Sequence, residues 1–198
     1  MRGNGLAMDM GEYKSELRRL AFSRRRAAKA ADAGAAEAAA SRFEAAGFAN
    51  GAMIVAGYRP IRTELDPTPL MERLSARGLR LAVPVIEGAG LPLMFREWSP
   101  GARMTTGAFG AEVPAEGAWV EPDLLIVPLV AFDRALWRLG YGGGFYDRTL
   151  EGLRAQRPTQ AIGYAFAAQA FDEVPREPTD QRLDAVVTEA EVIGPSAE

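Results

Sequence analysis

The stretch that decides the fold is DLLIVPLVAFDRALWRLGYGGGFYDR, residues 123–148. It opens with an apolar run at residues 123–128, which is typical of a short, fully buried β-strand. A cluster of glycines at positions 140 and 142–144 follows, and a helix is expected from about residue 145 to 154. A strand that leads through glycines into a helix is typical of α/β proteins, and the N-terminus of such a helix is suited to bind an anion.

Outward from this stretch, apolar periodicity predicts alternating helices and strands. Helices are expected at residues 12–29, 35–46 and 69–77, and strands at residues 52–58, 79–85, 91–98, 161–165 and 184–188. Residues 99–121, which are rich in Gly and Pro, are expected to form a long loop or hairpin. We therefore expect one α/β domain at residues 12–192, with helices on both faces of a mostly parallel sheet, preceded by a flexible tail at residues 1–11.

Composition excludes several classes of function. The chain has 198 residues, a net charge of −3, no cysteine and no histidine. The negative charge argues against nucleic-acid binding, because proteins that coat nucleic acid carry a basic excess. No apolar run reaches the roughly 20 residues that span a bilayer, and no secretory segment is visible, so a cytoplasmic protein without membrane contact is expected. Catalysis would rest on carboxylates, Arg, Lys, Tyr, backbone N–H groups and hard cations, which are the materials of phosphoryl transfer.

The glycine cluster is the first candidate binding site. Backbone N–H groups of the loop at residues 140–146 can approach a phosphate closely, and Arg138 at its entrance can bind one with two hydrogen bonds. Asp147, in the first turn of the following helix, could hold hydrated Mg²⁺ beside the phosphates or merely complement the helix dipole. The loop lacks the residues of a Walker A motif and the glycine spacing of a Rossmann fingerprint.

A second candidate is the basic N-terminal helix. Lys14 and Arg18 are four residues apart and share one face, where an anion between them would offset their repulsion. Arg24, Arg25 and Arg26 follow on the same helix. Spacing alone favours a solvated helix face over a ligand site, because runs of charge are commonly exposed.

Two further stretches could contact a ligand. Residues 58–66 follow a predicted strand, where open α/β sheets hold their ligands, and Glu64 there could accept hydrogen bonds from the N–H groups of a heterocycle. Asp66 is better suited to cap the next helix. Residues 94–98 and Phe109 supply aromatic rings that could stack on a flat ligand, although packing in the core explains them equally well.

Together these motifs resemble the 5-formyltetrahydrofolate cyclo-ligase family, also called 5,10-methenyltetrahydrofolate synthetases. RLGYGGGFYDRTL, residues 138–150, is similar to the family signature almost letter for letter. The resemblance spans roughly residues 12–190, in order. Its other elements are residues 128–133, the pattern Lys14-x-x-Leu-Arg18, residues 64–66, Gln169, residues 174–175, Asp180 and residues 187–189.

The resemblance implies a three-layer α/β sandwich similar to phosphosugar isomerases and CoA transferases. It also implies an ATP- and Mg²⁺-dependent enzyme that cyclises 5-formyltetrahydrofolate to 5,10-methenyltetrahydrofolate and releases ADP and phosphate. In the implied mechanism the formyl oxygen attacks the γ-phosphorus of ATP, and a folate amine closes the ring on the imidate phosphate that results. We expect a monomer that binds these small molecules only.

Carried over position by position, the resemblance implies roles for individual residues. Arg138 and Lys14 are the implied catalytic residues, and Asp147 is the implied ligand of Mg²⁺. The residues implied to contact the folate are Tyr58, Glu64, Phe109 and Tyr146. The residues implied to bind ATP are Lys14, Arg18, Arg138, Leu139, Gly140, Tyr141, Gly142, Gly143, Gly144, Phe145 and Tyr146. The chain departs from some members at Gly143, where they have Lys, and from others at Pro67, where they have Thr.

Two other functions stay open on the residues alone. A phosphosugar isomerase or an acyl-CoA-type transferase could use a similar fold, with Glu64 or Asp133 as base or nucleophile, and would need no loop for Mg²⁺–ATP. A non-catalytic folate- or nucleotide-binding module would have the same pocket without turnover.

Overall fold

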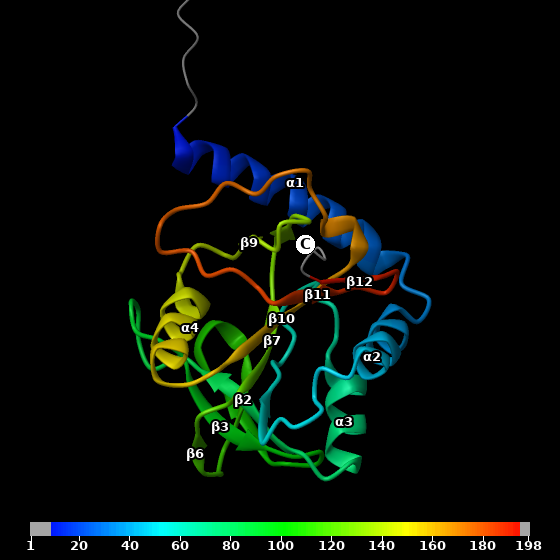
Figure 1. Ribbon diagram of the computed structural model, residues 1–198, viewed down its shortest axis with the longest axis vertical. Coiled ribbons are helices and arrows are strands. Elements are labelled where there is room, and N and C mark those ends of the chain that lie inside the picture. The colour runs from blue at the N-terminus through cyan, green and yellow to red at the C-terminus, as the bar shows by residue number, and fades with distance from the viewer. Residues whose placement is uncertain (1–8, 195–198) are drawn as a thin grey trace, which may run out of the picture.

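The computed structural model describes residues 9–194 and confirms the alternation of helices and strands (Figure 1). The helices are α1 (Met10–Ala30), α2 (Ala35–Ala46), α3 (Thr68–Ala76) and α4 (Phe145–Gln156), with short 3₁₀ turns at Ala108–Gly110 and Ala167–Gln169. The main sheet is built from β1 (Ile54–Ala56), β2 (Arg80–Val85), β3 (Met94–Trp98), β6 (Trp119–Val120), β7 (Leu124–Pro128), β10 (Gln160–Tyr164), β11 (Ala185–Val187) and β12 (Val192–Ile193). None of the helices within residues 9–194 combines the length and the hydropathy that crossing a membrane requires.

The sheet is mostly parallel, as predicted. Its strand order is β12-β11-β10-β7-β1-β2-β3-β6, in which β11, β10, β7, β1 and β2 run parallel and the strands at the two edges run antiparallel. Helix α4 covers one face, and α2 and α3 cover the other, so the three-layer α/β sandwich is confirmed (Figure 1).

The central strand β7 explains why the apolar run at residues 124–127 decides the fold. Leu124 and Ile126 pack into the core cluster that α2 and α3 share, whereas Leu125 and Val127 pack into the cluster on the side of α4. All four are at most 1% exposed. A strand that is buried on both faces needs an apolar residue at every position, which is why it reads as a continuous run.

Two hairpins lie outside the main sheet. The predicted loop or hairpin at residues 99–121 contains β4 (Met104–Thr106) paired with β5 (Glu112–Pro114), and it ends in the edge strand β6. The second hairpin, β8 (Ala131–Phe132) with β9 (Arg138–Leu139), was not predicted. The carboxylate of Asp133 stabilises its turn by accepting the N–H groups of Trp137 and Val174, each at 3.0 Å. This hairpin sets the position from which the glycine loop departs.

Helix α1 begins earlier than predicted. Its first turn includes residues 10 and 11, which we had expected in the tail, because the N–H of Tyr13 already donates to the carbonyl of Asp9 at 2.9 Å. The rest of the expected tail, residues 1–8, lies outside the described residues. At the other end of the chain, β12 is a strand that periodicity did not predict, because only two residues form it.

Candidate functional site

A cavity of about 710 Å³ lies where the parallel strands β1, β2 and β7 end. This is the edge at which open α/β sheets hold ligands. The cavity is lined by every residue for which the sequence implied a role: Lys14, Arg18, Tyr58, Glu64, Phe109, Arg138, Leu139, Gly140, Tyr141, Gly142, Gly143, Gly144, Phe145, Tyr146 and Asp147. The fold therefore gathers α1, the loop after β1 and the glycine loop around one space.

The glycine loop connects β9 to α4 and is tied to α1. Arg18 donates from Nε to the carbonyl of Gly140 at 2.9 Å. Gly144 has a φ of 64°, a left-handed conformation in which a side chain is disfavoured, and it lets the chain turn directly into α4. A Cβ at Gly143 would lie 2.6 Å from the ring of Phe145, so a side chain there would displace that ring. The backbone N–H groups at the start of α4 can therefore face an anion in the cavity.

Arg138 and Asp147 hold the two ends of this loop together. Nη2 of Arg138 lies 2.7 Å from Oδ1 of Asp147, and the guanidinium also donates to the carbonyl of Gln181. The same carboxylate oxygen accepts the N–H of Gln181 at 2.9 Å. No hydrogen bond within residues 9–194 engages Oδ2 of Asp147, so this oxygen can serve a ligand.

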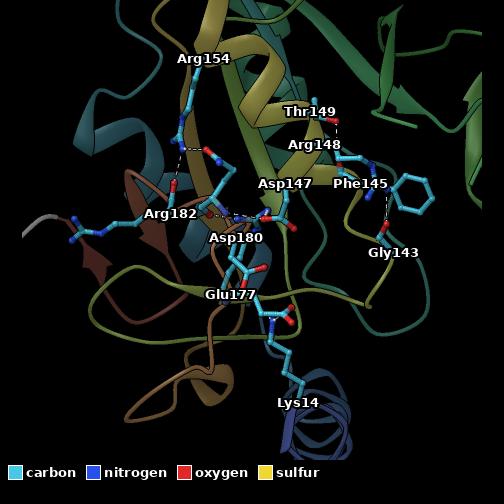
Figure 2. A network of polar contacts seen from close by, with 12 residues as sticks. Lys14, Gly143, Phe145, Asp147, Arg148, Thr149, Arg154, Glu177, Asp180 and Arg182 are labelled. Atoms are coloured by element: carbon cyan, nitrogen blue, oxygen red, sulfur yellow. Dashed lines mark hydrogen bonds and ion pairs between the residues drawn. The ribbon is translucent and has the colours of Figure 1, made fainter. Parts of the chain in front are cut away.

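Lys14 is held by two carboxylates. Figure 2 shows it reaching from α1 toward Glu177, at 2.8 Å from Nζ, and Asp180, at 3.1 Å. Burial lowers the pKa of the amine, but the hydrogen bonds to the two carboxylates outweigh burial and raise the pKa above its usual value. The side chain is buried, so a solvated helix face is wrong for this side of α1. The amine is charged and points into the cavity.

Glu64 is a buried carboxylate at the wall of the cavity and is 4% exposed. Its Oε2 accepts the N–H of Ile61 at 2.8 Å, and its Oε1 accepts the hydroxyl of Tyr141 at 3.0 Å. Burial raises the pKa of this carboxyl, while the N–H of Ile61 and the charge of Arg25 oppose the rise. Tyr58 donates its hydroxyl to the carbonyl of Leu65, so this proton is not available to a ligand.

The aromatic residues divide between the cavity and the core. Phe109 is 76% exposed, and its ring lies edge-on to that of Phe145, with 6.4 Å between the ring centroids. The buried hydroxyl of Tyr146 has no partner within residues 9–194, and burial raises its pKa. Phe95 and Trp98 are buried in the two core clusters and do not line the cavity. Core packing is therefore the correct explanation for that stretch.

Several contacts at and behind the cavity were not predicted from the sequence. Glu177 and Asp180 hold Lys14 from 163 and 166 positions away, a distance that no local pattern reveals. Arg25, 1% exposed, lies behind Glu64 and Tyr141. A usable signal did exist for Arg25, since it stands 7 and 11 positions after Arg18 and Lys14 and so shares their helix face. Asp133, considered as a base, is committed to backbone N–H groups and does not line the cavity.

The fold and the site define a class: an α/β protein whose ligand cavity, at the carboxyl edge of the sheet, combines a glycine loop with basic side chains. The model of the 5-formyltetrahydrofolate cyclo-ligase family matches residues 10–189. The chain belongs to this family, as the motifs predicted, and it is an enzyme, a ligase of folate metabolism.

Individual relatives agree with the family. The chain is 39% identical over 145 residues to the 5-formyltetrahydrofolate cyclo-ligase of Escherichia coli K12, which covers 70% of this chain and 79% of the relative. It is 33% identical over 185 residues to that of Mycolicibacterium smegmatis, covering 88% and 93%. The NMR structure of Aquifex aeolicus 5,10-methenyltetrahydrofolate synthetase superimposes with a TM-score of 0.77 at 32% identity, covering 93% of this chain and 94% of that one.

Proposed function

We propose that this enzyme uses ATP and Mg²⁺ to cyclise 5-formyltetrahydrofolate to 5,10-methenyltetrahydrofolate, with release of ADP and phosphate. The observation that carries the proposal is the content of one cavity: a glycine loop at a helix N-terminus, six basic side chains, a buried carboxylate and exposed aromatic rings. Such a cavity suits two ligands at once, one that carries phosphates and one that carries a flat heterocycle. The names of the relatives supply the heterocyclic ligand, a folate, and the resemblance of the motifs to the family implies ATP as the ligand that carries phosphates.

The phosphates of ATP would lie against the loop at residues 140–146 and the N-terminus of α4. Arg18 and Arg138 line this part of the cavity as fixed guanidinium groups, each anchored by a hydrogen bond to the backbone. Lys14 would exchange at least one of its carboxylate partners for a phosphate oxygen. Cations in fixed positions favour phosphoryl transfer, because they stabilise charge on the transferring group without having to reorganise.

The carboxylates of the cavity fit a Mg²⁺ ion that arrives with the nucleotide. Within residues 9–194, no group of three or more acidic, His or Cys side chains could hold an ion alone. Mg²⁺ commonly takes one or two carboxylates together with substrate phosphates and water. Oδ2 of Asp147 has no hydrogen bond within residues 9–194. Asp180 lines the same cavity and precedes Gln181, whose N–H donates to Asp147. These two residues would hold the ion, which would neutralise phosphate charge.

The folate would occupy the part of the cavity around Glu64. A carboxylate is an acceptor only, so it suits the N–H groups of a reduced pterin, and its burial strengthens those bonds. The rings of Tyr58, Phe109 and Tyr146 line the same space and can pack on a flat ring system. The buried hydroxyl of Tyr146 has a hydrogen bond to offer, which a polar atom of the folate can take.

The chemistry then needs positioning and charge stabilisation, with no protein nucleophile. The formyl oxygen attacks the γ-phosphorus, the bond to ADP breaks, and an imidate phosphate forms. The neighbouring folate amine adds to the activated carbon and gives up its proton, and the departing phosphate takes the formyl oxygen and this proton with it. Arg138 and Lys14 would stabilise the charge that develops on the phosphoryl oxygens, while the cavity holds the two substrates in contact.

The rival functions predict different behaviour. Of the two carboxylates considered as base or nucleophile for an isomerase or transferase, Glu64 lines the cavity and Asp133 does not. The test is to incubate the purified protein with 5-formyltetrahydrofolate and follow the absorbance of the methenyl product. We expect product only when ATP and a divalent cation are both present. Product at full rate in excess EDTA, or without nucleotide, would contradict the proposal, and binding without turnover would favour a non-catalytic module.

A further inference from the structure

Arg25 is the most enclosed charge at the site, although it stands in the middle of a run of three arginines. Its side chain is 1% exposed, whereas Arg24 and Arg26 on either side are exposed. The guanidinium carbon lies 5.2 Å from the ring centre of Phe22 and 5.4 Å from that of Tyr141. A buried charge is costly unless it is paired, so the groups around Arg25 should be the reason for its position.

Those groups lead directly to Glu64. Nη2 of Arg25 donates to the hydroxyl of Tyr141 at 2.8 Å, and that hydroxyl donates to Oε1 of Glu64 at 3.0 Å. Nε of Arg25 donates to Thr63, the neighbour of Glu64, at 3.1 Å. Nη1 lies 4.0 Å from the same Oε1 and has no hydrogen-bond partner within residues 9–194. The charge of Arg25 therefore faces the carboxylate with the tyrosine hydroxyl as a bridge.

The bridging hydroxyl of Tyr141 keeps both its proton and its position. Burial, followed by the charge of Glu64, raises the pKa of Tyr141 to about 12, so the hydroxyl stays protonated near neutral pH and continues to donate. Its ring packs on that of Phe22 with 5.5 Å between centroids, which limits its rotation. Tyr141 thus fixes one oxygen of Glu64 while the N–H of Ile61 fixes the other.

We infer that Arg25 and Tyr141 are positioning residues for Glu64: Tyr141 orients its carboxylate, and Arg25 keeps that carboxylate charged so that it can accept N–H groups of the folate ring. This inference rests on the proposed function. Neither residue needs to touch the folate for this role, and each acts through Glu64. Without them, burial would favour the protonated carboxyl, which offers an O–H donor to the N–H groups of the ligand and binds it poorly.

The test uses Tyr141→Phe, Arg25→Gln and the control Arg26→Gln, which removes a neighbouring exposed charge. Tyr141→Phe retains the ring and the backbone N–H of the glycine loop and loses only the hydroxyl. We expect it to raise the KM for 5-formyltetrahydrofolate about tenfold, the effect of one hydrogen bond to a charged group, with a much smaller change for ATP. Calorimetry with 5-formyltetrahydrofolate alone should show the same loss of affinity. Arg26→Gln should match the wild type.

The pH profile separates positioning of Glu64 from a general structural role. The titratable and charged groups that face Glu64 are Arg25 from α1, Arg62 from its own loop, Tyr58 after β1, Tyr141 from the glycine loop and Tyr146 from α4. Loss of a donor or of the positive charge disfavours the carboxylate, so the acid limb of kcat/KM for the folate should move to higher pH in Tyr141→Phe and further in Arg25→Gln. Arg25→Lys should restore the pH of the acid limb more fully than it restores the KM for the folate. Lysine returns the positive charge, but it cannot make the hydrogen bonds of the planar guanidinium.

The outcomes are distinct from those of the proposed function. An active wild type whose Tyr141→Phe variant keeps its folate KM, its affinity in calorimetry and its acid limb would overturn this inference alone. A wild type without turnover would overturn the proposed function and this inference with it. If Arg25→Gln fails to fold, Tyr141→Phe decides the matter, because its side chain is 38% exposed and its replacement leaves no buried charge on the loop.

Discussion

Arg138, the first residue of β9, and Asp147, in the first turn of α4, form an ion pair of 2.7 Å that connects the two ends of the glycine loop. Arg138 is almost fully buried, at 4% exposed, whereas Asp147 is 25% exposed. The pair holds the loop, and the proposed function gives Arg138 a second role, in stabilising charge on the phosphates. Substitutions can separate these roles.

Replacing Arg138 tests its role in holding the loop and its proposed role in stabilising phosphate charge. Arg138→Ala should lower the free energy of unfolding by about 2 kcal/mol, since it leaves Asp147 without its partner in a partly exposed place. If the guanidinium also stabilises the transition state, kcat should fall by about a hundredfold or more, and Arg138→Lys should recover only part of it. Melting temperature and steady-state kinetics on one preparation measure both effects. A less stable variant with wild-type kcat would remove Arg138 from the catalytic residues.

Asp147→Asn should lower the rate by weakening the binding of Mg²⁺. Asn keeps an oxygen that can accept the N–H of Gln181, so the fold should persist. Raising the Mg²⁺ concentration should restore much of the lost rate, because binding is the expected defect. Rates measured over a Mg²⁺ titration check this. A variant that equals the wild type at limiting Mg²⁺ would mean that Asp147 serves only Arg138 and the helix dipole.

Glu177→Gln should lower the KM for ATP. In the proposed function Glu177 competes with the phosphates for Lys14, and removing its charge leaves the amine with Asp180 alone. Because Glu177 is more than half exposed, we expect only about a two- to fivefold change. The control is Glu173→Gln, which removes an exposed carboxylate that does not line the cavity. An unchanged or higher KM for ATP would argue that Lys14 does not move to the nucleotide.

Gln169 should prove structural, although it belongs to the motifs shared with the family. Its amide donates to the carbonyls of Leu129 and Val130 at 2.8 and 3.0 Å, and its oxygen accepts the N–H of Phe166 at 3.0 Å. Gln169→Leu would leave three buried backbone groups unpaired and should cost about 3 kcal/mol of stability. Denaturant unfolding measures this, with the exposed Gln156→Leu as control. A loss below 1 kcal/mol would contradict this role.

The sequence predicted the fold well wherever one local pattern determines an element. The run at residues 124–127 specifies a buried strand by itself, and the glycines before residue 145 indicate where helix α4 begins. The hairpin β8–β9 was missed because its two-residue strands carry no periodicity and its turn depends on Asp133. The motifs named residues that the structure brings together in one cavity. The pairing of Lys14 with Glu177 depends on a segment distant in the chain, so local spacing could not reveal it. The spacing of Arg25 from Lys14 and Arg18 did indicate a shared helix face, but not its contact with Tyr141.

The most direct test of the account follows the formyl oxygen itself. Substrate labelled with ¹⁸O in the formyl group is converted in the presence of ATP, and the inorganic phosphate is analysed by mass spectrometry while the methenyl product is quantified. In the proposed mechanism the formyl oxygen attacks phosphorus and leaves with it, so one labelled phosphate is expected for each methenyl product. Unlabelled phosphate would contradict the proposed mechanism. So would methenyl product that forms without ATP and releases the label as water.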